Sequence, residues 1–261
     1  MMAKSNSPLR ILLLGGTTEA VSLADRFAHE KSIAATLSLA GRTTNPIASP
    51  LPVRIGGFGG IEGLFDYLKR EKVDLLVDAT HPFAARISSN AIAACGGANI
   101  PLLAIERPPW TRVTGDDWAE HDSIDAAIAA LPLEPQDVFS GLGRQSIAAL
   151  SKAPQHRYLI RVVDAIEAPS ILPHATIIAA RGPFLADDDI RLFERHGIGH
   201  VLAKNAGGSA AYSKIEAARK LGIKVHMVCR PVIASRLTVA SIEDAMTWIA
   251  TLHRRRSDLG V

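Results

Sequence analysis

Short apolar runs alternate with amphipathic stretches along most of the chain. The first run, the four aliphatic residues 11–14, stops at paired glycines and passes into a helix-forming segment near Thr18. A run of this length that ends at glycine is typical of a buried parallel strand followed by a helix. Strand, loop and helix repeat in this order almost to the C-terminus, which predicts an α/β fold of doubly wound parallel sheets.

The predicted elements fall into two groups of similar length, and each group indicates a Rossmann-like domain. We expect strands at residues 9–14, 33–40, 53–55, 73–77, 101–105, 138–140, 158–163, 175–179, 200–203 and 224–228. Helices are expected between them and at residues 242–252. The proline-containing loop at residues 132–137 is the best linker candidate. We therefore place an N-terminal Rossmann-like domain at residues 1–132 and a C-terminal Rossmann-like domain at residues 133–261.

Composition excludes several classes of protein. No apolar run among the 261 residues approaches the roughly 20 residues that a membrane helix needs. The short polar segment before Leu9 lacks the apolar core of a secretory signal. Cys95 and Cys229 lie far apart, which predicts a reducing, cytoplasmic location without a disulfide or metal site. The net charge of +3 is too small to indicate nucleic acid binding.

The junction after the first strand predicts an anion site. Gly15, Gly16, Thr17 and Thr18 lie where backbone N–H groups at a helix N-terminus point at a ligand, and a diphosphate suits such a site. The dinucleotide fingerprint is matched only in part, as Gly15-x-Thr17-x-x-Ala20. The alternative is a turn whose small residues only allow close packing of helix and strand.

The end of the second predicted strand indicates which dinucleotide binds. Gly41, Arg42 and Thr43 follow this strand, and no acidic residue is present there to bind a ribose 2′-hydroxyl. Arginine and threonine instead supply a cation and a hydroxyl donor for a 2′-phosphate, which favours NADPH over NADH. The alternative is that Arg42 is a solvated loop charge.

Basic residues recur at the predicted carboxyl ends of strands in the second half. Arg144, Arg181, Lys204 and Arg230 lie there, which predicts a substrate with several carboxylates or phosphates. In the first half, His81 follows Thr80 at a strand end, where it can donate a proton or bind the nicotinamide region; the alternative is a histidine that caps backbone groups.

Other common chemistries lack their residues. None of the three tyrosines, Tyr67, Tyr158 and Tyr212, has the lysine four positions later that short-chain reductases use. His196 and His200 have metal-ligand spacing, but intervening glycines break the helix that would align them. No nucleophile elbow and no Walker lysine pattern occurs.

Seven motifs in order resemble the precorrin-6A reductase family of cobalamin biosynthesis, from about residue 9 to residue 250. They are LGGTTEA at 14–20, AGRT at 40–43, RIGGFGG at 54–60, DATHPFA at 78–84, RPPW at 107–110, RGPF at 181–184 and KNAGG at 204–208. The family often has serine in the last motif where this chain has Ala206.

The resemblance implies NADPH-dependent reduction of one carbon-carbon double bond in a ring-contracted tetrapyrrole. It also implies two Rossmann-like domains facing a cleft with exchanged terminal strands, so that the boundary near residue 132 need not separate independent folding units. We expect the residues 15–18 to bind the diphosphate, 41–43 the 2′-phosphate, and Thr80 with His81 the nicotinamide ribose. Substrate carboxylates would be held by Arg144, Arg181, Lys204, Asn205, Gly207, Gly208 and Arg230, with His81 and Lys204 as the catalytic candidates.

Three alternatives stay open from the sequence. The same reaction can act on a cobalt-containing substrate, because no metal-sensing residue is legible. A non-catalytic NADPH-binding regulator would share the first half but would not need the cations of the second. A nucleotide-sugar or other anion-modifying enzyme could use the same strand ends. The expected partner is a small polycarboxylate tetrapyrrole, with hand-over to neighbouring pathway enzymes, and neither nucleic acid nor membrane.

Overall fold

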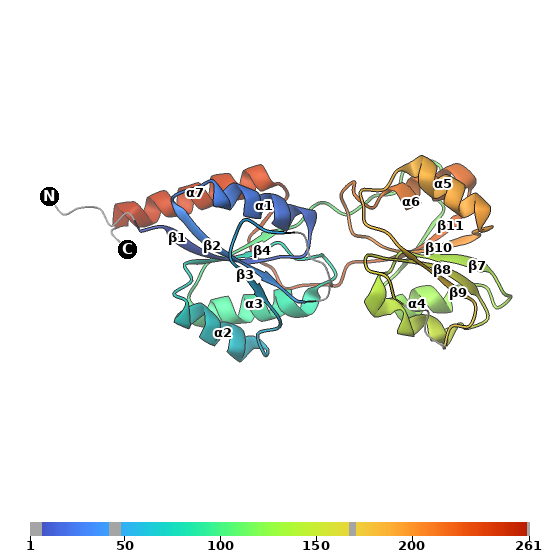
Figure 1. The fold of residues 1–261 in the computed structure, drawn as a ribbon, viewed down its shortest axis with the longest axis horizontal. Coiled ribbons are helices and arrows are strands. Elements are labelled where there is room, and N and C mark those ends of the chain that lie inside the picture. Colours follow the sequence, from blue (N-terminus) through green and yellow to red (C-terminus); the bar gives the residue numbers. More distant parts are fainter. Residues whose placement is uncertain (1–6, 42–47, 167–170, 260–261) are drawn as a thin grey trace. The chain divides into compact units, whose positions relative to one another are not determined.

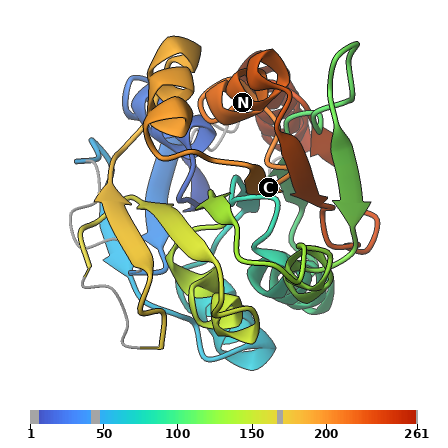
Figure 2. The same ribbon diagram turned by 90° about the vertical axis from the view of Figure 1, so that its right-hand side faces the viewer.

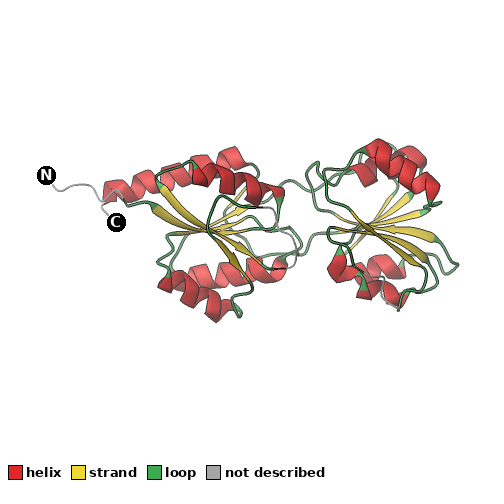
Figure 3. Ribbon diagram, viewed as in Figure 1, coloured by secondary structure: helices red, strands yellow, loops and turns green. Residues whose placement is uncertain are grey.

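A computed structural model describes residues 7–41, 48–166 and 171–259 of the protein. The chain forms two compact units: unit 1 comprises residues 1–107 and 232–261, and unit 2 comprises residues 108–231. Each unit contains one six-stranded sheet, in which every strand pair is parallel, with helices on both faces (Figures 1 and 3). The predicted α/β class with two doubly wound sheets is confirmed.

Unit 1 has the strand order β12-β5-β4-β1-β2-β3. Its strands are β1 (Leu9–Leu14), β2 (Ile33–Leu39), β3 (Val53–Ile55), β4 (Leu75–Asp78), β5 (Leu102–Ile105) and β12 (Thr238–Val239). Its helices are α1 (Thr18–Ala28), α2 (Ile61–Arg70), α3 (Ala85–Ala98) and α7 (Ile242–Leu259).

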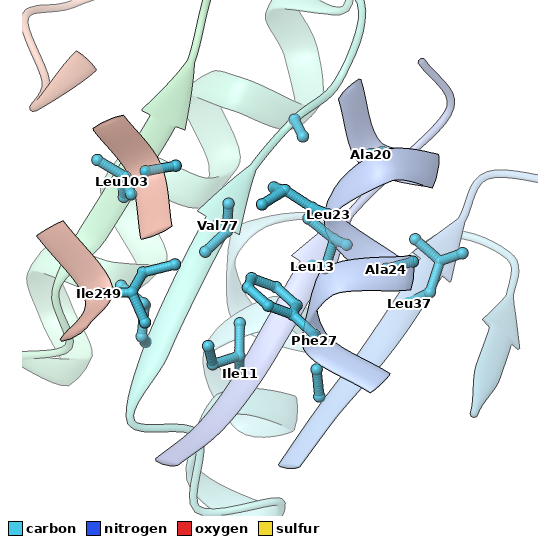
Figure 4. Packing of buried hydrophobic residues seen from close by; sticks show 14 of the residues in the cluster. Ile11, Leu13, Ala20, Leu23, Ala24, Phe27, Leu37, Val77, Leu103 and Ile249 are labelled. Atoms are coloured by element: carbon cyan, nitrogen blue, oxygen red, sulfur yellow. The ribbon is translucent and has the colours of Figure 1, made fainter. Parts of the chain in front are cut away.

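Apart from the exposed Arg10, the central strand β1 is buried on both faces, as the apolar run at residues 11–14 predicts. Ile11 and Leu13 point to one face, where they pack with Phe27 of α1 and Ile249 of α7 (Figure 4). Leu12 and Leu14 pack on the other face, with α2 and α3. Because successive side chains of a strand alternate between faces, one apolar run supports both helical layers.

Unit 2 has the strand order β6-β11-β10-β7-β8-β9. Its strands are β6 (Trp118–His121), β7 (Asp137–Ser140), β8 (Arg157–Val162), β9 (Ala175–Ala179), β10 (His200–Lys204) and β11 (Lys224–Val228). Its helices are α4 (Ile124–Ala129), α5 (Ala186–Arg195), α6 (Ser213–Leu221) and the two 3-10 helices η1 (Arg144–Ser146) and η2 (Ala148–Lys152). Figure 2 shows the twist of this sheet between its edge strands, β6 in green and β9 in yellow-orange.

The division into units differs from the predicted boundary at residue 132, which falls inside unit 2. Strand β6 pairs with β11, so the segment before residue 132 completes the second sheet. Strand β12 pairs with β5, and α7 packs on the core of unit 1, so the C-terminal segment completes the first. The proline-containing loop is the connection from α4 to β7, and local composition does not reveal these long-range pairings.

Candidate functional site

The loop after β1 is shaped for close approach of an anion. Thr17 caps α1: its hydroxyl accepts from the Ala20 N–H at 3.2 Å and donates to the Ala79 carbonyl at 2.7 Å. Gly16 has φ +123°, and a Cβ there would meet no atom within 4 Å. Only glycine tolerates this conformation well and leaves the space beside the helix N-terminus open to a ligand. The loop therefore fits the diphosphate of a dinucleotide.

Gly15 is needed for packing. A Cβ at Gly15 would lie 2.6 Å from Cδ1 of Leu37 on β2. Its N–H donates to the Ser38 carbonyl at 3.0 Å, which extends the pairing of β1 with β2 into the loop. Gly15 therefore serves the close packing of helix and strand, whereas the space beside Gly16 is open and the diphosphate role of the loop stays a prediction.

An ion pair lies beside this loop. Glu19 in the first turn of α1 accepts from Nη1 of Arg107 at 2.8 Å, and both side chains are largely buried. Burial acts to raise the pKa of Glu19, but the hydrogen bond and charge of Arg107 outweigh it and hold the pKa below its usual value. The residue that leads the chain out of unit 1 is thus fixed to the predicted phosphate loop.

The predicted 2′-phosphate subsite is described only in part. Arg42 and Thr43 lie outside the described residues, whereas Gly41 has φ +72° at the end of β2. A second guanidinium, Arg54 of β3, lies nearby: it donates to Oγ of Ser38 at 3.1 Å and to the Gly56 carbonyl at 2.8 Å. It also stacks on Phe58 at 3.7 Å from the ring centroid. Arg54 is not among the site residues predicted from the sequence.

Thr80 and His81 follow β4 at the carboxyl edge of the same sheet. The Thr80 hydroxyl and N–H both donate to Oδ1 of Asp78, at 2.7 and 3.1 Å. Nδ1 of His81 accepts from the Phe83 N–H at 3.2 Å, so a neutral His81 ring carries its proton on Nε2. His81 therefore caps backbone, as the alternative interpretation held, and still presents a donor nitrogen.

Asp78, at the end of β4, is buried next to Arg236 at the same edge of the unit 1 sheet. Asp78 is 2% exposed, and its Oδ2 lies 3.9 Å from Nη2 of Arg236 and has no hydrogen bond. The same guanidinium lies 3.6 Å from Glu106. Arg236 follows the return of the chain from unit 2, so both segments that join the units are anchored at this edge by an arginine.

In unit 2, Lys204 ends β10 and turns toward the loop after β7. Its ammonium donates to the Leu142 carbonyl at 2.7 Å and to the Ser146 hydroxyl at 3.1 Å. Burial lowers the pKa of Lys204. Arg144 begins η1 in that loop and is exposed. Lys204 thus supports the segment that presents Arg144 to solvent.

The segment after Lys204 is held by Trp110. The Asn205 side chain accepts from the Trp110 N–H at 2.8 Å and donates to the Trp110 carbonyl at 2.9 Å. The indole N–H donates to the carbonyl of Gly208, which, like Gly207, has φ +69°. Arg230 donates to the carbonyl of Asn205 at 3.0 Å. These predicted substrate residues lie together, and their hydrogen bonds shape the loop itself.

Arg181 follows β9, and its side chain is 41% exposed. Its Nη2 lies 3.8 Å from Oδ1 of Asp164. Its loop touches the loop after β10, since the Phe184 N–H donates to the carbonyl of Ala210 at 3.4 Å. The structure therefore brings the loops of Arg181 and Lys204 together at one edge of the sheet.

Sequence reasoning missed a buried polar group beneath these loops. Arg161 of β8 pairs with Asp189 of α5, and Ser213 of α6 donates to Oδ2 of Asp189 at 2.6 Å. Lys214, the next residue, is 6% exposed. A charged residue inside the apolar stretch of β8 was the signal for a buried partner.

In the described ranges, no group of three or more His, Cys, Asp or Glu side chains is arranged to hold a metal ion. His200 instead forms a row with two other histidines, with Nδ1 at 3.1 Å from Nε2 of His226. No helix in the described part of the chain is both long and apolar enough for a membrane span.

Comparison with known proteins decides the family. The sequence matches the family precorrin-6x reductase CbiJ/CobK over residues 10–250. The chain belongs to this family. It is 50% identical to a precorrin-6A reductase of Rhodobacter capsulatus over 241 aligned residues, and the aligned region covers 92% of this chain and 96% of the relative.

Two other relatives define the family context. A solved structure titled CobK precorrin-6A reductase matches with a TM-score of 0.88 and 50% identity, over 94% of this chain and 96% of that one. A cobalt-precorrin-6A reductase of Priestia megaterium is 26% identical over 90% of this chain and 96% of its own length. The precorrin-6x reductase family therefore accounts for nearly the whole chain.

Proposed function

We propose that the protein reduces one carbon-carbon double bond of precorrin-6A with NADPH, in cobalamin biosynthesis. The observation that carries this proposal is the 50% identity to a precorrin-6A reductase over 92% of the chain. The open loop at Gly16 and the uncrowded N-terminus of α1 support a dinucleotide in unit 1. NADPH, when bound, supplies the hydride.

The residues of unit 1 bind and orient the cofactor in this proposal. Residues 15–18 take the diphosphate, and Arg42 with Thr43 takes the 2′-phosphate, with Gly41 providing the turn. Thr80 and His81 lie at the carboxyl end of β4, next to β1, where the nicotinamide half of a dinucleotide that begins at Gly16 belongs. The Nε2–H of His81 is then a donor toward the nicotinamide or its ribose.

The residues of unit 2 bind the substrate. Arg144 and Arg181 expose guanidinium groups that suit the acetate and propionate arms of a tetrapyrrole. Asn205 and Arg230 hold the loop that contains Gly207 and Gly208 in shape, and Lys204 supports the loop after β7. We keep His81 and Lys204 as the candidates for contact with the reacting groups, where holding donor and acceptor carbons together is the main requirement.

Two finer points belong to the same proposal. The identity of 50% to a precorrin-6A reductase, against 26% to a cobalt-precorrin-6A reductase, favours the metal-free substrate. We further propose a cytoplasmic location and hand-over of the product to neighbouring pathway enzymes.

The test is NADPH oxidation in the presence of metal-free precorrin-6A and, separately, its cobalt form. We expect faster oxidation with the metal-free substrate, and a shift in the macrocycle spectrum. Arg42→Ala should weaken NADPH binding by about 1 to 3 kcal/mol and NADH binding far less, because only NADPH loses a charge-assisted contact. NADPH binding without hydride transfer to either substrate would instead indicate a regulator, and equal losses for both cofactors would exclude the role of Arg42.

A further inference from the structure

Four polar side chains are buried together in unit 2, between β8 and the helices α5 and α6. Arg161 and Asp189 form an ion pair with side chains 10% and 2% exposed. Ser213 donates to the same carboxylate, and Lys214 lies beside it on the first turn of α6. Lys214 donates to the carbonyl of Ala211. We call these four residues, Arg161, Asp189, Ser213 and Lys214, the buried cluster.

The charges of the buried cluster do not balance when Lys214 is protonated. Arg161 and Lys214 would then contribute two positive charges against one negative charge from Asp189. The Nε atom of Arg161 is also buried without a hydrogen bond. Burial, together with the charge of Arg161 and against that of Asp189, lowers the pKa of Lys214 to about 7. The free protein therefore holds Lys214 near its midpoint of protonation at neutral pH.

The buried cluster lies directly beneath the proposed substrate loops. A Cβ at Gly141, three residues before Arg144, would lie 3.2 Å from the Lys214 stem. The ammonium lies 4.9 Å from the ring centroid of Trp110, which holds the loop after β10. Arg161 lies 4.2 Å from the ring of Phe184, in the loop of Arg181. Three of the loops that present candidate carboxylate-binding groups, those after β7, β9 and β10, thus contact this cluster.

We propose that Lys214 is a buried proton-binding site that fills when a carboxylate of the substrate docks on these loops, and that it thereby favours polyanionic substrates. An anion at the loops supplies the negative charge that the cluster lacks, so that the ammonium form becomes stable. The proton comes from solvent and joins the Lys214 amine, with no change in any other bond. This inference rests on the proposed function, which provides the polycarboxylate substrate.

The linkage has a definite sign. Protonation of Lys214 and carboxylate binding favour each other, so bound substrate raises the pKa of Lys214 above its value of about 7 in the free protein. Affinity is then greatest below about pH 7 and falls by up to about tenfold per pH unit above it, until the bound form also loses its proton. Between the two pKa values, binding takes up a fraction of a proton from solvent.

The experiment is calorimetric titration of the NADP-bound protein with precorrin-6A at pH 7.5, in two buffers of different ionisation enthalpy. The wild type should take up roughly half a proton per substrate. Lys214→Met should lose this uptake and the fall in affinity above pH 7. Lys214→Arg, which keeps a permanent cation and guards against misfolding of the methionine variant, should bind without uptake and stay tight at pH 8.5. Lys220→Met is the matched control, because Lys220 lies on α6 with its side chain 51% exposed and should leave uptake unchanged.

The outcomes separate this inference from the proposed function. Binding of precorrin-6A without proton uptake by the wild type overturns the inference and leaves the function intact. Equal uptake by wild type and both Lys214 variants also overturns it. Failure of precorrin-6A to bind, while NADPH binds, overturns the proposed function and the inference with it.

Discussion

The row of three histidines in unit 2 predicts a specific loss of stability in mild acid. His226 of β11 is 2% exposed and lies between His200 and His121, with ring nitrogens 3.1 and 3.3 Å apart. Burial, His200, His121 and Lys224 together lower the pKa of His226 to about 4, against the opposing charge of Asp117. Burial also lowers the pKa of each outer histidine.

The magnitude follows from proton linkage. The unfolded chain binds a proton at His226 below about pH 6.5, but the folded protein does so only near pH 4, so stability is lost as the pH falls between these values. From pH 7 to pH 5 this one histidine lowers the free energy of unfolding of unit 2 by about 2 kcal/mol.

The assay is urea unfolding at pH 7 and pH 5, followed by tryptophan fluorescence in a Trp248→Phe background. Trp110 and Trp118, the two remaining tryptophans, then report on unit 2 alone. His226→Gln removes the titrating ring and keeps a donor and an acceptor, so its stability should fall by about 2 kcal/mol less between the two pH values. His174→Gln, at an exposed position of unit 2, is the control. An unchanged pH dependence in His226→Gln would refute the reasoning.

Two further predictions concern the loops. Gly15→Ala places a methyl group against Leu37, so the free energy of unfolding should fall by about 1 to 2 kcal/mol and NADPH should bind more weakly. Thermal unfolding measures the stability, and Gly96→Ala on α3 is the control that should cost none, because a Cβ there meets nothing within 4 Å. Asn205→Ala leaves the Trp110 N–H and carbonyl without their partner, so urea unfolding should show a free energy of unfolding lower by about 1 to 3 kcal/mol, and the KM for precorrin-6A should rise. A higher KM with an unchanged free energy of unfolding would instead indicate that Asn205 contacts the substrate directly.

The sequence predicted features whose cause is local. The apolar run of β1, the glycines after it and the cap at Thr17 lie within a few residues of one another, so the strand, loop and helix could be read directly. The placement of basic residues at carboxyl strand ends likewise follows from strand positions alone. The class of fold and the loops that form the candidate sites were therefore accessible from the sequence.

The orientation of side chains depends on distant partners and could not be read. Asn205 bonds to Trp110, 95 positions away, and Lys204 to Leu142, 62 positions away. Nothing near Lys204 or Asn205 in the sequence indicates that these polar groups turn onto the backbone. The predicted domain boundary at residue 132 differs from the observed division into units for the same reason, because the pairing of β12 with β5 joins segments that are far apart in the chain.

The pairing of β12 with β5 makes unit 2 an insertion within unit 1. Residues 108–231 interrupt a unit that needs residues from both ends of the chain. A protein shortened from its C-terminus therefore loses β12 and α7 from the first unit while the second keeps all of its strands. Conversely, unit 2 is the one of the two that a continuous stretch of the gene encodes, so a single gene fragment carries all of its strands, whereas no single fragment without unit 2 carries those of unit 1.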